Sequence, residues 1–318
     1  MQDIIKATNE KRADHKTSQI ARTQLKDINK KLPLQVLSSD DFDHWQQKGF
    51  VIVKNAISQD KVEAMKALLW EFEDKDPNDT KTWYADQRQE HAMKELNNAG
   101  MVEIYHNQLL WDNRCEPKIY AAFVDIWDRE ELWVSIDRAN LNTPNKDNRQ
   151  SSGFIHWDVD TTLDVPSIGV QGVLSLVHQT ADDDIGGFQC VPYLFEHFDE
   201  WVKTQPCDRH CYFPDMTGLT PIKVALEPGD LLIFNCLLAH GVAPNTSDDK
   251  ARMAQYISMH PAEPENTAER DARIYLFENR ETPPRSAFPG DPRNWEKTKY
   301  AAAKLNSLGE KLLGRKSW

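Results

Sequence analysis

The residue types and spacing that could do chemistry begin with a histidine and an aspartate, one residue apart. His156 and Asp158 stand in the apolar stretch FIHWD. Alternate side chains of a strand point to the same face, so both could bind one metal ion. Imidazole and carboxylate suit a first-row divalent metal, and a second histidine would complete the triad of non-haem Fe(II) oxygenases. Taken alone, the pair also fits a strand end that binds no metal.

A third ligand and a cationic partner lie farther along the chain. His240 follows an apolar run headed by the turn Pro228-Gly229-Asp230, and Arg252 opens the next apolar run. A guanidinium that points into a barrel needs a carboxylate partner, because an unpaired buried charge is very costly. A dicarboxylate co-substrate would supply that partner through a two-pronged contact.

The net charge of the chain limits the classes of function that it can have. The 318 residues carry a formal net charge of −12 and a pI near 5.3, which argues against a nucleic-acid-binding protein. Residues 1–31 are the exception, with eight Lys/Arg against four Asp/Glu. We predict a basic helical arm there, packed on the main domain through Ile20, Leu25 and Ile28; an interaction arm is the alternative.

The cysteines and the apolar runs indicate a compartment. The cysteine count is odd, the first residues lack an apolar signal-like segment, and no run approaches the roughly 18 apolar residues of a membrane span. We therefore expect a reduced, cytoplasmic protein without membrane contact. Cys207 and Cys211 flank His210 but lack a second ligand pair, which predicts a loop with free thiols.

The elements that must position these residues change along the chain from a helical pattern of apolar residues to a pattern of short strands. Residues 40–130 predict a helical buttress, interrupted by a short strand at 50–53; its helices are expected at 40–48, 58–72, 85–98, 101–112 and 117–128. Residues 131–260 predict eight short strands, at 132–141, 154–160, 168–178, 187–191, 222–226, 231–236, 238–243 and 252–259. Eight strands without intervening helices predict a mainly β fold, a cupin-like double-sheet jelly roll with the helices against its outer sheet.

Two further segments complete a single domain over 1–318. An insert at 195–220 begins as a helix and continues as a long loop, and loops of that length are often functional lids. The extension 261–318 turns irregular at Pro261, and we expect helices at 295–305 and 308–313.

The motifs together resemble one enzyme family. His156-x-Asp158, His240 and Arg252 match the pattern of Fe(II)- and 2-oxoglutarate-dependent dioxygenases. The turn at 186–188, the run EPGDLLIF at 227–234 and the pair His240-Gly241 resemble the phytanoyl-CoA dioxygenase (PhyH) family. The resemblance covers about residues 130–260 strongly and the helical start from about residue 40 more loosely.

The resemblance implies roles for individual residues. His156, Asp158 and His240 would hold Fe(II), and Arg252 would bind the distal carboxylate of 2-oxoglutarate, with O2 as the second co-substrate. Many members carry a hydroxyl two places after the arginine, where this chain has Ala254, so another donor would have to replace it. Further cofactor or substrate contacts could come from Arg138, Asn140 and Gln171, for which ordinary structural contacts are the alternative.

The retained carboxylate of Asp158 predicts hydroxylation, dealkylation or desaturation, since related halogenases have a small residue there. The acidic chain offers little to the phosphates of CoA, so we expect a small, polar metabolite, such as an amino-acid-derived natural product, rather than a fatty acyl-CoA. The alternatives are a non-catalytic metal-binding sensor or scaffold and a zinc hydrolase, which would have no use for Arg252. We expect a monomer or homodimer. Candidate pocket residues are Trp157, Phe188, Trp201 and Tyr212 as aromatic walls, and Arg138 and Arg280 as anion receivers.

Overall fold

The computed structural model describes residues 25–26, 28–84, 98–146, 153–163, 166–284 and 287–318. Most of the basic arm and nearly all of the helix expected at 85–98 lie outside these ranges. Within the arm, residues 28–31 are not helical, although Leu25 and Ile28 do pack against the main hydrophobic cluster.

Two antiparallel sheets form the body of the fold. The larger has the strand order β1-β8-β5-β10-β4-β2 and the second has the order β7-β6-β9, which the bridge between His156 and His240 extends by one more segment. A two-stranded ladder pairs β11 with β3. The strands are β1 (Phe50–Val53), β2 (Met101–Val102), β3 (Leu132–Val134), β4 (Ala139–Asn142), β5 (Val170–Ser175), β6 (Gly187–Cys190), β7 (Ile222–Lys223), β8 (Leu231–Asn235), β9 (His240–Ala243), β10 (Arg252–Tyr256) and β11 (Met259–Pro261).

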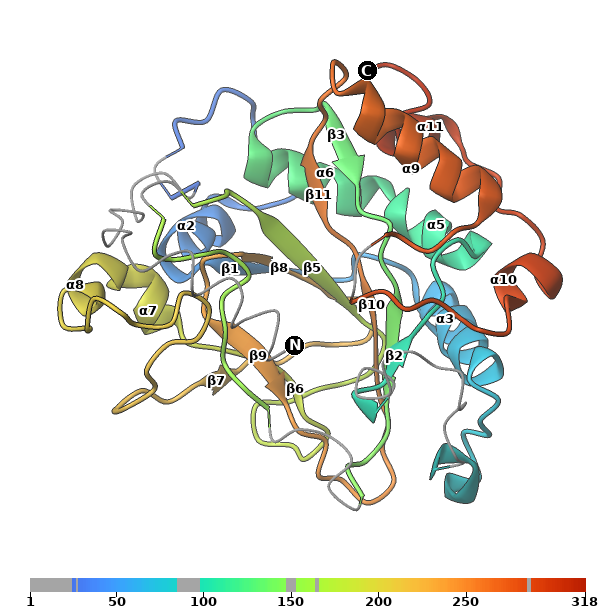
Figure 1. Ribbon diagram of the computed structural model, residues 1–318, viewed down its shortest axis with the longest axis horizontal. Coiled ribbons are helices and arrows are strands. Elements are labelled where there is room, and N and C mark those ends of the chain that lie inside the picture. Colours follow the sequence, from blue (N-terminus) through green and yellow to red (C-terminus); the bar gives the residue numbers. More distant parts are fainter. Residues whose placement is uncertain (1–24, 27, 85–97, 147–152, 164–165, 285–286) are drawn as a thin grey trace.

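Helices cover the outer face of the larger sheet, so the predicted jelly roll with flanking helices is confirmed (Figure 1). In Figure 1, α3, α5 and α6 lie on one side of the strands and β6, β7 and β9 on the other. The helices are α2 (Ser39–Lys48), α3 (Gln59–Phe72), α5 (Gln108–Arg114), α6 (Pro117–Trp127), α7 (Pro192–Glu196), α8 (Phe198–Val202), α9 (Thr267–Asn279), α10 (Trp295–Thr298) and α11 (Ser307–Leu313), with a 3-10 turn η2 (Thr80–Tyr84).

Local signals set the helix ends. Ser38 accepts a hydrogen bond from the Asp41 amide while the Asp41 side chain accepts from the Ser38 amide, which is a capping box at the start of α2. Gly49 ends the same helix in the left-handed conformation, at φ 79°. Pro117 occupies the first turn of α6, where its missing N–H costs nothing.

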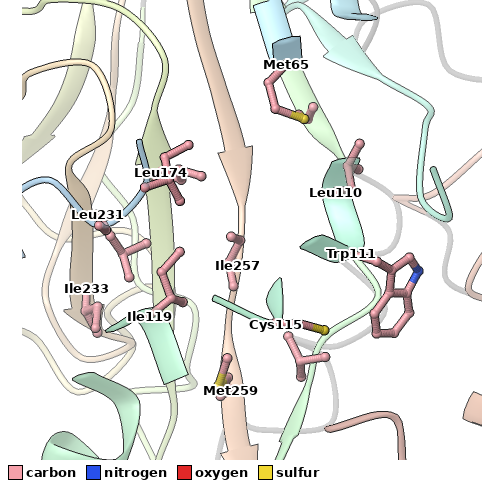
Figure 2. Packing of buried hydrophobic residues seen from close by; sticks show 14 of the residues in the cluster. Met65, Leu110, Trp111, Cys115, Ile119, Leu174, Leu231, Ile233, Ile257 and Met259 are labelled. Carbon is pink, nitrogen blue, oxygen red and sulfur yellow. The ribbon is translucent and has the colours of Figure 1, made fainter. Parts of the chain in front are cut away.

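Alternation along the strands separates two hydrophobic clusters. Leu174, Leu231 and Ile233 point outward and pack with the helices, as Figure 2 shows for their cluster. Their neighbours in sequence point inward: Val173, Leu232 and Phe234 belong to the second cluster, together with Phe188 of the second sheet. The inward face of the larger sheet therefore looks toward the second sheet.

Hydrogen bonds of the turn Pro228-Gly229-Asp230 hold the start of β8 in place. Asp230 is buried, and its carboxylate accepts hydrogen bonds from the Lys54 ammonium at 2.8 Å and the Asn55 amide at 2.9 Å. These contacts join β8 to the end of β1, its antiparallel neighbour. Because β8 leads directly into β9, this turn helps to fix the strand that begins with His240.

Several sequence-based boundaries were wrong. The runs predicted as single strands at 132–141 and 252–259 each divide between two sheets: β4 and β10 pair in the larger sheet, and β3 and β11 pair in the two-stranded ladder. Between the two ladders the Ser135 amide donates to the Ser258 carbonyl at 2.8 Å. Helix α9 occupies a stretch expected to be irregular. The helix expected at 295–305 stops at Thr298, since Arg280 donates to the carbonyls of Glu296, Lys297 and Tyr300.

Candidate metal centre

One backbone bridge brings the two histidines together. The His156 amide donates to the His240 carbonyl at 2.8 Å, and the His240 amide donates back at 2.9 Å. Directly paired residues of antiparallel strands share a face, and the two ring centroids lie 4.5 Å apart. Asp158, two residues on, points to the same place.

The three side chains have the spacing of ligands around one ion. Nε2 of His156 lies 3.4 Å from Oδ1 of Asp158, and Nε2 of His240 lies 3.2 Å from Oδ2. One atom from each residue falls within 4.8 Å of the others. Two imidazoles and a carboxylate arranged on one face suit Fe(II) and leave other coordination positions open. The residues predicted from sequence as metal ligands therefore converge and fit the group.

The packing around His240 fixes its orientation. Its Nδ1 donates to the Leu238 carbonyl at 2.9 Å, which leaves Nε2 with the lone pair that a metal requires. The rings of Phe188 and Phe234 pack against it, with centroids at 5.7 Å and 4.5 Å. Phe188, expected as a pocket wall, is buried and supports the ligand instead.

The site is open on one side and holds an ionised carboxylate. The side chains of His156 and Asp158 are 27% and 28% exposed, whereas that of His240 is 9% exposed. Burial raises the pKa of Asp158, but hydrogen bonds and charge interactions with the two histidines outweigh it and hold the pKa well below its ordinary value. The carboxylate is thus in the form that binds a metal.

Gln171 contacts the metal ligands directly. It lies on the inward face of β5, and its Nε2 donates to Oδ2 of Asp158 at 2.5 Å. The sequence suggested a contact with the co-substrate, and the structure adds a specific partner, the carboxylate itself.

Arg252 lies on the inward face of β10 and is buried. One guanidinium nitrogen donates to the Asn140 side-chain oxygen at 2.9 Å, while Nε has no partner among the described residues. An unpaired buried donor favours an anionic ligand. Across the sheet, Ala254 pairs in register with Asn140 and with Ser175, whose side chains already donate to the carbonyls of Ala99 at 3.0 Å and Val177 at 2.8 Å.

Arg138 has a different surrounding. Its guanidinium donates to Glu103 at 2.6 Å inside the protein, and the ring of Phe288 covers it, with the centroid 4.4 Å away. No sequence pattern indicates this pair, since Glu103 lies in a stretch that was expected to be helical. Arg138 is therefore already neutralised, which weakens the interpretation of a ligand-binding arginine.

Other predicted pocket residues serve packing. Trp157 points away from the ligands and packs on Phe198 and Trp201, with ring centroids at 5.8 Å and 5.6 Å. The guanidinium of Arg280 binds backbone carbonyls of the C-terminal extension. Neither tryptophan lines the open side of the metal ligands, and Arg280 is not free to receive an anion.

The insert is tied to the segment that carries His156 and Asp158. The Trp157 amide donates to the Tyr212 carbonyl at 2.8 Å, and the Thr161 amide donates to the Cys211 carbonyl at 3.1 Å. The two bonded amides lie on either side of Asp158 in sequence, so this part of the insert is a neighbour of the site. Each of the five cysteines is a thiol that forms no disulfide with another described residue.

Comparison with known proteins agrees with this geometry. Residues 45–254, about two thirds of the chain, match the profile of the phytanoyl-CoA dioxygenase (PhyH) family. A similar protein is Ava biosynthesis cluster protein O of Aspergillus versicolor, which is 25% identical over 265 residues, covering 74% of this chain and 82% of that protein. Among the described residues, no helix combines the length and apolar character needed to cross a membrane.

Solved structures share the fold. The GlcNAc-inducible protein GIG2 of Candida albicans superposes with a TM-score of 0.60 at 13% identity, covering 86% of this chain and 75% of that one. The hypothetical protein JW0805 of Escherichia coli gives a TM-score of 0.60 at 15% identity and covers 87% of this chain and 82% of its own. With the family profile matched over most of its length, the chain belongs to the phytanoyl-CoA dioxygenase family and is a 2-oxoglutarate-dependent, non-haem iron oxygenase that uses O2.

Proposed function

We propose that the protein oxidises a small, polar metabolite, with His156, Asp158 and His240 as the iron ligands and Arg252 as the anchor of 2-oxoglutarate. The observation that carries the proposal is the convergence of the three ligand side chains within 4.8 Å, on the same side as the inward face of β10. When bound, iron and 2-oxoglutarate supply the oxidising chemistry, in which O2 is consumed, the co-substrate becomes succinate and carbon dioxide, and the substrate is oxidised.

The side chains of this chain prepare that chemistry. Leu238 and Gln171 hold His240 and Asp158 in orientation, so the ligands need little rearrangement when they bind the metal. Asn140 holds one nitrogen of Arg252 and leaves Nε to an incoming carboxylate. The aromatic rings on His240 keep water away from one side of the site.

The reaction type follows from Asp158. A carboxylate at this position occupies the place that a halide would need, so we assign hydroxylation, or dealkylation or desaturation that follows it. The protein with 25% identity is named for a biosynthesis cluster, which supports a natural-product substrate. A net charge of −12 disfavours the phosphates of a fatty acyl-CoA. We further propose a monomer or homodimer that acts on free metabolites and not on nucleic acid, in the cytoplasm.

A succinate assay tests the proposal. Purified protein with Fe(II), 2-oxoglutarate and O2 should release succinate slowly, and a metabolite library should contain members that accelerate release. Asp158→Ala and His240→Ala should abolish even the slow release, because the metal is lost. His178→Ala is the matched control, since His178 forms an exposed pair with Glu227 at 2.7 Å elsewhere. Unchanged release by the two ligand variants would overturn the assignment.

A further inference from the structure

A half-exposed aromatic side chain stands directly beside the metal ligands. Phe154 precedes His156 by two residues, its ring centroid lies 5.0 Å from the imidazole, and it is 50% exposed. Phenylalanine is usually buried, so an exposed ring at this point is surface that a bound molecule could cover.

The insert extends this surface. The ring of Phe213 meets that of Phe154 at 5.8 Å and 71°, and the ring of His210 packs on Phe213 at 4.6 Å. Together they form a continuous path from a metal ligand outward, which we call the aromatic rim (Phe154, Phe213 and His210). Because the two phenylalanine rings are steeply inclined to each other, a flat ring bound between them would meet the edge of one ring and the face of the other. These are the two contacts that aromatic rings prefer.

The rim is held at a fixed distance from the metal ligands. Besides the backbone bonds from Trp157 and Thr161 to the insert, the Arg209 guanidinium donates to the Thr161 hydroxyl at 2.7 Å. These bonds lie on both sides of Asp158 in sequence. A molecule that binds the rim therefore meets a preformed surface and loses little free energy to ordering the protein.

His210 ends the rim with a defined donor. Its Nδ1 accepts hydrogen bonds from the amides of Tyr212 at 3.0 Å and Phe213 at 3.2 Å. Burial lowers the pKa of His210, so the ring is neutral and its single proton is on Nε2. In the part of the chain that the structure describes, Nε2–H has no hydrogen-bond acceptor.

We infer that the aromatic rim is the substrate-recognition surface, and that the substrate combines a flat apolar ring with a carbonyl or similar acceptor. The ring would lie in the corner of Phe154 and Phe213, and the acceptor would receive the Nε2–H of His210. This inference rests on the proposed function, since it places the molecule to be oxidised next to His156. It narrows the proposed substrate from small, polar metabolites in general to those that contain a flat ring and carry a hydrogen-bond acceptor about one ring's length from that ring.

Three small probes separate the two contacts. Indole-3-acetamide has a ring and an acceptor, indole has the ring alone, and hexanamide has the acceptor alone. Their dissociation constants are measured by anaerobic calorimetry on the protein loaded with Fe(II) and 2-oxoglutarate. We expect indole-3-acetamide to bind about tenfold more tightly than either of the other two. With Mn(II) in place of iron, its proton signals should broaden, because the rim begins at a metal ligand.

Variants then assign each contact. His210→Asn keeps an acceptor for the two backbone amides but removes the Nε2–H, so the preference for indole-3-acetamide over indole should disappear. Phe213→Ala should remove the preference over hexanamide. The matched controls are Tyr193→Ala and His197→Asn in α7 and just after it, because these two rings lie 4.7 Å apart, close to the 4.6 Å between His210 and Phe213. Both controls should bind all three probes as the wild type does.

The outcomes distinguish this inference from the function on which it rests. If the visible band of the Fe(II)–2-oxoglutarate complex fails to form, the proposed function fails. If the band forms but the wild type binds the three probes equally, or the rim variants behave as the Tyr193 and His197 controls do, the assignment of the rim is overturned.

Discussion

At the scale of single residues, the two oxygens of Asp158 have different neighbours. Oδ1 faces His156, while Oδ2 faces His240 and accepts a hydrogen bond from Gln171. A metal needs only one of these oxygens, so the amide can hold the other and fix the rotation of the carboxylate. Gln171 then acts on the iron through Asp158, as a positioning residue.

Replacing Gln171 with leucine should therefore weaken iron binding. We expect the Fe(II) dissociation constant to rise about 10- to 100-fold in an anaerobic titration, as for other residues that orient metal ligands. At saturating iron, the requirement for 2-oxoglutarate should stay as in the wild type. Gln189→Leu, a glutamine on β6 without a described side-chain hydrogen bond, is the control. A raised 2-oxoglutarate requirement with normal iron binding would instead identify Gln171 as a co-substrate contact.

Arg252 and Arg138 are both buried, but only one has a charged partner. Arg252→Met should raise the 2-oxoglutarate concentration needed for half-maximal formation of the visible band by at least about 30-fold, since a buried charge pair is lost. Arg138→Met leaves the buried Glu103 carboxylate without its cationic partner, so it should lower stability while the 2-oxoglutarate requirement stays unchanged. The opposite pattern would exchange the roles of the two arginines.

At the scale of elements, α6 holds the chain segment that precedes α2. Asp125 is fully buried, and its carboxylate accepts the backbone amides of Gln35 at 2.8 Å, Val36 at 2.9 Å and Leu37 at 2.9 Å. Removing the acceptor leaves three amide donors without a partner. The segment and the helix are thereby coupled, although they lie far apart in sequence.

Asp125→Ala should lower the free energy of unfolding by about 3 kcal/mol. This is the cost of leaving the three buried amides without an acceptor, reduced by the hydrogen bonds that water can make to them in the variant. Urea denaturation of the variant and the wild type measures the difference. Asp43→Ala, on the exposed side of α2, should change stability by less than about 0.5 kcal/mol. Equal effects of the two substitutions would show that the amides find other partners.

The elements also show which features a sequence can predict. Alternation along an extended segment was enough to predict that His156 and Asp158 share a face, although the strand expected at 154–160 is reduced to a single bridge from His156 to His240 of β9. Helix α9 was missed because Pro261 before it and the prolines from Pro283 onward after it suggested an irregular stretch, although Asn266 caps it by accepting from the Glu269 amide. Pairings such as Arg138 with Glu103 depend on which strands become neighbours, and nothing local encodes them.

At the scale of the whole molecule, a buried carboxylate fastens the C-terminal extension to the core. Glu296 of α10 accepts the backbone amides of Tyr105 at 2.8 Å and His106 at 2.7 Å, just before α5. Burial raises the pKa of Glu296 to about 7, against the lowering effect of these amides and of Arg114. The extension is therefore held by a group that titrates near neutral pH.

The sign of the resulting pH dependence follows from linkage. Between its ordinary pKa of 4.5 and about 7, Glu296 is protonated in the folded protein and ionised in the unfolded chain, so its contribution to stability falls as pH rises. The stability of the wild type minus that of Glu296→Gln, from urea denaturation, should decrease by about 3 kcal/mol across this window and stay constant above it. His106, whose pKa burial lowers to about 3, titrates in both proteins, so the comparison removes its effect. A difference independent of pH would mean that the amides keep Glu296 ionised in the folded state.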